Sequence, residues 1–201
     1  MNPSIFGKLA LLMIVSGAFM TDLQAQAVIG IKAGVNFATL GGSDASGLKN
    51  RTGFVGGFLV NAPLSDHVSL QPEAVYSGEG ANAYDNSLAL TTSYINIPLL
   101  LKITDRSGVF AELGPQVGLL MSARVNSQGT SADVKSAYKS TDFSFAFGLG
   151  YYSGSSGLGF DFRFNLGLTN IEDNSSSLSQ GGSVKNNVIQ LTMFYLFNNK
   201  D

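Results

Sequence analysis

Apolar and other side chains alternate with a period of two along most of the chain. The segment 158–168 has apolar residues at every even position, and its odd positions hold Gly159, Asp161, Arg163, Asn165 and Gly167. A helix would mix these two sets, so the alternation is typical of a strand with two different faces. Similar alternation occurs in seven further segments, 29–37, 54–62, 70–76, 94–103, 109–123, 142–151 and 188–197. The sequence therefore predicts an all-β protein with eight strands.

The connections between these segments alternate strictly in length. Short turns occupy 64–67, 104–107 and 153–156. The other connections are long and polar, and they cover 41–51, 78–93, 124–141 and 169–187. This alternation predicts an up-and-down antiparallel meander with all short turns at one end. Because the number of strands is even, both termini are expected at the short-turn end.

Two kinds of closed barrel fit eight such strands, a soluble lipocalin-like barrel with an apolar interior and an outer-membrane barrel with an apolar exterior. Only 13% of the residues are charged, against about a quarter in an ordinary soluble domain. One face of every segment, including the odd positions of 109–123 up to Ala123, carries no charge. A Lys or Arg that faces lipid at mid-membrane costs about 2–4 kcal/mol, which explains this exclusion.

The charge pattern thus favours an eight-stranded antiparallel up-and-down transmembrane β-barrel. We expect it in the outer membrane, surrounded by outer-membrane lipids and with both termini in the periplasm. A secreted lipocalin-like ligand-binding barrel is the alternative that the composition favours less.

The opposite faces of the strands hold charged residues that should point into the barrel. They are Lys32, Glu73, Lys102, Glu112, Asp142, Asp161 and Arg163. The interior of an eight-stranded barrel is just wide enough for side chains to fill. Three cations and four anions nearly balance, whereas a selective pore usually has an excess of one sign. We expect a charge network that closes the lumen, and a small passive channel for small solutes is the alternative.

Three prolines, Pro72, Pro98 and Pro115, fall inside predicted strands. Proline has no N–H to donate to a neighbouring strand. These positions are therefore expected to mark bulges that shift the local register.

Both ends of the chain carry export features. Lys8, the apolar stretch 9–20 and the small residues Ala25 and Ala27 have the layout of a secretory signal peptide. We expect cleavage after Ala25 or Ala27, so that 1–25 is a signal peptide and 26–201 is the barrel domain. The chain has no cysteine, which excludes disulfides and a lipid anchor on cysteine.

The last predicted strand alternates toward an aromatic end, and four residues follow it. Its alternate residues are Ile189, Leu191, Met193, Tyr195 and Phe197. This pattern resembles the terminal signature by which outer-membrane barrels are recognised, so the barrel-insertion machinery is an expected partner. Aromatic residues near strand ends are expected to form girdles at the membrane surfaces. They are Tyr76, Tyr94, Tyr151, Tyr195 and Phe197.

The chain offers little catalytic or metal-binding chemistry. His67 is the single histidine and lies in a predicted short turn, where we expect it to be solvated. Glu172, Asp173 and Asp133 are expected to be solvated loop charges rather than a cation site. The glycine clusters lack the GK[ST] that a phosphate loop requires. We expect no enzymatic activity, no cofactor and no metal. The net charge of −2 gives no basic surface for nucleic acid.

Several phrases resemble the PorT-like family of outer-membrane β-barrels. They are AGVNFATL, TGFVGGF, PLSDHVSLQPEAVYSGEGA, YINIPLLLKI, AELGPQVGLLMSA, DFSFAFGLGYY, DFRFNLGLTNI and VIQLTMFYLF. The resemblance implies a small eight-stranded barrel in the outer membrane of Gram-negative bacteria. It also implies a structural or interaction role as an accessory of type IX protein export, with secretion-system proteins as partners. It carries over no catalytic or binding residue.

Overall fold

The computed structural model describes residues 27–41, 48–83, 88–127, 130–171 and 184–197. The predicted signal peptide, 1–25, lies outside these ranges. Within them the chain forms nine strands, β1 (Val28–Gly41), β2 (Leu48–Pro63), β3 (Val68–Ala83), β4 (Leu88–Thr104), β5 (Val109–Ser127), β6 (Thr130–Asp133), β7 (Thr141–Tyr152), β8 (Leu158–Gly167) and β9 (Lys185–Leu196), and one 3-10 turn, η1 (Lys135–Ala137). No helix in the described part is both long and apolar enough to cross a membrane.

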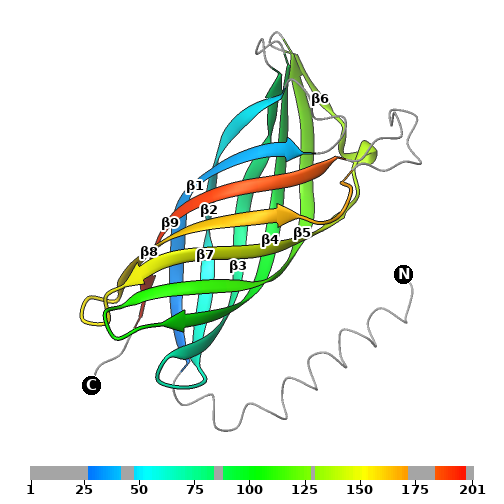
Figure 1. The fold of residues 1–201 in the computed structure, drawn as a ribbon. Helices are drawn as coiled ribbons and strands as arrows, with labels where there is room; N and C mark the ends of the chain where they lie inside the picture. Colours follow the sequence, from blue (N-terminus) through cyan, green and yellow to red (C-terminus); the bar gives the residue numbers. More distant parts are fainter. Residues whose placement is uncertain (1–26, 42–47, 84–87, 128–129, 172–183, 198–201) are drawn as a thin grey trace.

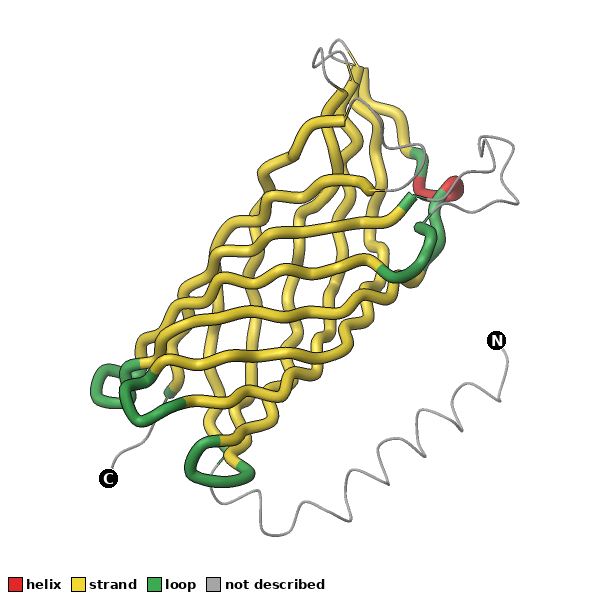
Figure 2. The backbone as a smooth tube through the Cα atoms, viewed as in Figure 1, coloured by secondary structure: helices red, strands yellow, loops and turns green. Residues whose placement is uncertain are grey.

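Eight of the strands close into a single antiparallel barrel (Figures 1 and 2). Each strand pairs with the next along the barrel, and the last, β9, pairs with β1 over Gly30–Gly41. The short strand β6 pairs only with the end of β5 and forms a side hairpin outside the closed wall. The predicted eight-stranded up-and-down barrel is therefore confirmed.

The side chains alternate between the two surfaces of the wall as the sequence predicts. In β8, Phe160 and Phe162 are 57% and 50% exposed, whereas Asp161 and Arg163 are 2% and 1% exposed. Because strand side chains point to opposite faces in turn, the apolar set covers the outside and the polar set fills the inside. Exposed apolar residues cover the barrel so extensively that this outer surface suits lipid rather than water.

The three strand prolines do not shift the register, contrary to the prediction. The β3–β4 ladder is interrupted between the pairs Pro72–Leu99 and Val75–Asn96, but the same register continues on both sides. The shifts lie elsewhere, between Asn50 and Val55 in β2 and at Met121 in β5. A proline only leaves one hydrogen bond unmade, whereas a bulge adds a residue to one strand.

The bulge at Met121 reverses the faces of the rest of β5. Tyr94 pairs with Leu120 and Ser93 pairs with Ser122, so Met121 is the extra residue. Ala123 is consequently buried inside the barrel, and its assignment to the lipid face was wrong. Tyr94 is also buried inside, so it does not belong to an aromatic girdle.

Much of what was predicted as long loops is strand. The ladder between β5 and β7 ends at Leu119 and Thr141, but β5 continues to Ser127 and pairs there with β4. On the neighbouring side, β3 continues to Ala83 and pairs with the early part of β2. These extensions and β6 form a tall wall that rises above the other strands at the long-loop end (Figure 1).

The opposite end of the barrel is built from tight turns. Gly108 and Gly157 adopt φ values of 94° and 76°, which residues with a side chain adopt only at a cost. In the turn before β5, Asp105 Oδ1 accepts hydrogen bonds from Ser107 N at 2.8 Å and Ser107 Oγ at 2.6 Å. These contacts lower the pKa of the exposed Asp105 carboxyl, chiefly through the Ser107 hydroxyl.

Candidate functional site

The charged side chains inside the barrel are the candidate site. The structure places all seven predicted residues in the wall with buried side chains, Lys32 on β1, Glu73 on β3, Lys102 on β4, Glu112 on β5, Asp142 on β7, and Asp161 and Arg163 on β8. The alternation of each strand explains this placement, since every one of these residues is flanked by side chains that face outward.

Arg163 is the centre of this group. Its Nη1 and Nη2 each donate to a different oxygen of Glu73 at 2.9 Å, and its Nε donates to Glu112 Oε1 at 2.7 Å. A bidentate guanidinium–carboxylate pair is the strongest common ion-pair geometry. Glu73 lies on β3, four strands away from β8 in either direction around the barrel, so this pair spans the lumen.

Lys32 completes the network on the β1 side. Its Nζ lies 3.2 Å from Glu73 Oε1 and 3.0 Å from Asp161 Oδ2. Asp161 Oδ2 also accepts a hydrogen bond from Thr192 Oγ1 at 2.7 Å. Two cations and three carboxylates are therefore joined directly, and we name Lys32, Glu73, Glu112, Asp161 and Arg163 the central network.

Lys102 and Asp142 lie inside the barrel but outside the central network. Lys102 Nζ donates to Gln71 Oε1 at 3.4 Å and lies 3.5 Å from the centroid of the Phe110 ring. Asp142 accepts a hydrogen bond from Thr169 Oγ1 at 2.7 Å. Among the described residues, neither Lys102 nor Asp142 has an oppositely charged atom within 4.0 Å.

Glu79 is a further inward carboxylate that the prediction did not include. Its side chain is buried and accepts hydrogen bonds from Ser77 Oγ at 2.6 Å, Asn96 Nδ2 at 2.9 Å and Asn186 Nδ2. Gly78-Glu79-Gly80 reads as loop sequence, which hid its position in β3. The signal that could have found it is spacing, because Glu79, Ser77 and Glu73 differ by even numbers and share one face.

Apolar clusters lie toward both ends of this polar interior. Near the short turns, Leu59, Phe110, Phe194 and Leu196 form a buried cluster. Near the long loops, Tyr94, Leu120 and Ala123 form a second cluster against Val134 and Tyr138. The central network therefore lies between two apolar clusters.

The remaining candidate residues lie apart from one another. His67 is exposed in the turn before β3, and Asp133 is exposed in β6. Glu172 and Asp173 lie outside the described residues. Within the described part, no group of three or more His, Cys, Asp or Glu side chains is arranged to hold a metal ion.

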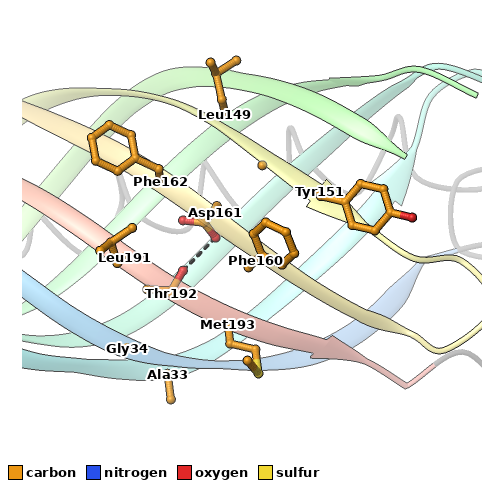
Figure 3. A pocket seen from close by; sticks show the side chains of 11 residues that line it. Ala33, Gly34, Leu149, Tyr151, Phe160, Asp161, Phe162, Leu191, Thr192 and Met193 are labelled. Atoms are coloured by element: carbon orange, nitrogen blue, oxygen red, sulfur yellow. Dashed lines mark hydrogen bonds between the residues drawn. The ribbon is translucent and has the colours of Figure 1, made fainter. Parts of the chain in front are cut away.

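The proposed insertion residues form one outward stripe. Leu191, Met193, Tyr195 and Phe197 are exposed on the lipid side, and Ile189 is partly exposed. The four residues after Phe197 lie outside the described part. Leu191 and Met193 also line a shallow apolar groove of about 700 Å³ on the outer wall, together with Ala33, Leu149, Phe160 and Phe162 (Figure 3).

Solved structures of small outer-membrane barrels resemble this fold. Neisserial surface protein A aligns with a TM-score of 0.55 and 12% identity, over 85% of this chain and 98% of that one. The attachment invasion locus protein Ail of Yersinia pestis aligns with a TM-score of 0.52 and 16% identity, over 86% and 99%. At these identities the likeness shows the fold alone. Among curated proteins, none matches the chain.

The family assignment agrees with this fold. Residues 24–173 match the family described as outer membrane protein beta-barrel domain, and this match covers most of the barrel. The predicted outer-membrane location is therefore confirmed. With its charged lumen and its apolar exterior, the chain belongs to the outer membrane protein beta-barrel domain family.

Proposed function

We propose that this protein is a non-enzymatic outer-membrane barrel with a lumen closed by side chains and a structural or interaction role at its long-loop end. The proposal of a closed lumen rests on the pairing of Arg163 with Glu73 across the barrel. Removing these charges from water is costly unless they stay paired, so the pairing holds opposite walls of the lumen together. An apolar cluster lies on either side of these paired charges, which supports a closed lumen.

Planar bilayer recordings test the closed lumen. The purified barrel should give no single-channel steps, because ions would have to cross both apolar layers and the central network. Arg163→Ala, which removes the side chain that spans the lumen but leaves both apolar clusters, is the matched variant, and steps that appear only in this variant would assign the closure to the central network. Regular steps from the wild-type protein would instead favour the passive channel for small solutes.

The tall wall supports the interaction role. All four residues of β6 are exposed, and β6 and the end of β5 project beyond the closed barrel. Such a projection contributes nothing to closing the barrel, which leaves binding as the function that would account for it. In this proposal the short turns and both termini face the periplasm and the tall wall faces outward. Protease added to intact cells should then cut within 124–133 and leave the short turns intact.

We propose protein export as the specific process in which the interaction role serves. The sequence phrases that resemble the PorT-like family support a role as an accessory of type IX secretion, with secretion-system proteins as partners. The outward stripe of β9 supports recognition by the barrel-insertion machinery during assembly. Cross-linking in outer membranes followed by co-purification should recover secretion-system proteins with the wild type. Recovery of none, together with normal export in a deletion strain, would leave a purely structural role.

A further inference from the structure

The tall wall (Figure 1) carries its apolar and polar side chains on the opposite sides from the barrel below it. In the barrel, polar side chains face the lumen and apolar side chains face outward. In the tall wall, the side that continues the lumen face is mostly apolar, and its polar residues, Asn50, Ser127 and Thr130, are uncharged. We name the apolar residues of this side the inner face, and they are Ala81, Ala83, Leu88, Leu90, Val125 and Ala132.

The strand register places these residues on one side of the sheet. Leu90 pairs with Ala81 on β3 and with Val125 on β5, and Val125 pairs with Ala132 on β6. Residues directly opposite each other in antiparallel strands point to the same side. Val125 also lies two residues after Ala123, which is buried inside the barrel, so both point to the same side. The inner face therefore continues the lumen side of the wall beyond the closed barrel.

The other side of the tall wall is polar and charged. Lys49, Arg124 and Asp133 are exposed there. Asn126 Nδ2 donates to Thr91 Oγ1 at 3.2 Å, which joins two further polar side chains on this side. Charged side chains are excluded from surfaces that face the hydrocarbon of the membrane. This part of the wall therefore stands in water, and lipid does not cover its inner face.

The chain itself has few apolar side chains that could cover the inner face. Leu88 is 46% exposed, and Ala132 is exposed as well. The other sequences that connect strands at the long-loop end, 42–47, 84–87, 128–129 and 172–183, contain only Ala45, Tyr84 and Leu178 as apolar residues. An apolar surface that is exposed to water marks an interaction site.

The strand β6 offers an open edge beside the inner face. In the described part of the chain it pairs only with β5, so the backbone groups of its other edge are available to a further strand. An extended polypeptide can join such an edge through main-chain hydrogen bonds, with every second side chain on the same side of the sheet. These side chains would lie beside Ala132 and continue the inner face.

We propose that the inner face binds an extended segment of a partner protein in which every second side chain is apolar. The segment joins the open edge of β6, and its apolar side chains cover Leu88, Val125 and Ala132. This assignment rests on the interaction role proposed for the tall wall, and it adds the side of the wall that binds and the chemistry of the partner.

Photo-cross-linking from two neighbouring residues of β6 tests this site in intact cells. The cross-linker p-benzoylphenylalanine replaces Ala132 on the inner face or Ser131, which is exposed on the other side. We expect Ala132 to give a discrete protein adduct that mass spectrometry maps to a segment with alternate apolar residues. Ser131 should give at least tenfold less of this adduct. Gel mobility of unheated samples checks that both proteins form closed barrels.

A pair of substitutions in β4 tests the apolar contact separately. Leu88→Lys places a charge on the inner face and should reduce the adduct from Ala132 by about tenfold or more, the effect of losing one buried leucine contact. Ala89→Lys changes the next residue, on the polar side of the wall, and is the matched control. It should leave the amount of adduct unchanged.

The possible outcomes separate this proposal from the interaction role itself. Cross-links from Ala132 only to lipid, to the chain itself or to a second copy of it would overturn the proposal. Equal amounts of adduct from Ala132 and Ser131, or an adduct that Leu88→Lys does not reduce, would overturn it as well. A partner captured from Ser131 alone would place the interaction on the polar side of the tall wall. Protein adducts from neither position would contradict both the inner-face site and the interaction role.

Discussion

Arg163 shows how one side chain can tie the barrel together. It extends from β8 to Glu73 on the opposite wall and to Glu112 on β5. Replacing one partner of a buried ion pair leaves the other charge uncompensated, which is more costly than removing both charges. The stability of the barrel should therefore depend on whether these charges remain balanced.

Arg163→Ala should lower the free energy of unfolding by about 3–5 kcal/mol, since it leaves carboxylates buried without a partner. Urea unfolding in lipid vesicles, followed by far-UV circular dichroism, measures this change. The double variant Arg163→Met with Glu112→Gln removes one charge of each sign and should lose less. An unchanged midpoint for Arg163→Ala would contradict the structural role of the central network.

Asp105, in a short turn outside the membrane-spanning strands, should make a pH-dependent contribution to the stability of the barrel. Because hydrogen bonds from Ser107 lower its pKa in the folded state, the ionised carboxylate stabilises the turn above its ordinary pKa. This contribution is lost as the pH falls through the lowered value. Asp105→Ala should therefore unfold at lower urea than the wild type at pH 7, and the gap between the two midpoints should shrink as the pH falls through the lowered pKa of Asp105. A gap that stays constant while the carboxylate is titrated would assign the effect to something other than this carboxylate.

At the scale of strands, the sequence predicts the membrane-spanning parts best. One side of β8 faces lipid and carries apolar side chains, and the other side faces the lumen and carries polar or small ones. This difference produces the regular alternation of 158–168. Toward the long-loop end this alternation fades, so 48–51 and 88–93 read as loops although they form strand. The bulge at Met121 cannot be read from the sequence. One extra residue exchanges the inward and outward sides for the rest of β5 without requiring any particular residue type. Ala123 was misplaced for this reason.

The seam between β1 and β9 depends on close backbone approach at Gly34. A Cβ at this position would overlap the Leu191 carbonyl oxygen and lie 2.7 Å from Thr192 Cα. The neighbouring Ala33 points outward and is exposed. Closing the barrel at this seam therefore requires a residue without a side chain at position 34.

Gly34→Leu should reduce the yield of closed barrel severely, whereas the matched variant Ala33→Leu should fold like the wild type. The shift in gel mobility between unheated and heated samples measures the closed fraction. Similar yields for the two variants would show that the seam can open to accept a side chain.

At the scale of the whole molecule, the closed barrel and the hairpin 124–133 are separable. Val134 N donates to Ala123 O at 3.0 Å, so the two ends of the hairpin 124–133 meet at the rim. The second apolar cluster includes Ala123 and packs against Val134, so both ends of the hairpin join it. The hairpin can thus be removed without opening the interior.

Excision of 124–133, with a two-residue Gly-Asn link between Ala123 and Val134, should leave the unfolding midpoint nearly unchanged. If the hairpin 124–133 carries the interaction, the same excision should abolish cross-linking to partners in outer membranes. A folded, excised barrel that still captures the same partners would place the interaction elsewhere.

The uneven rim also gives the barrel a direction within the plane of the membrane. From Leu119 to Ser127, β5 runs on without β7, a length of roughly 25 Å along the strand. A cylinder with a level rim would look the same from every side, but here the projecting arm stands off the axis of rotation. As the barrel rotates in the bilayer, the direction in which this arm points changes with it. The arm is therefore available to neighbours in the same membrane only on the side of the barrel where β4 and β5 lie.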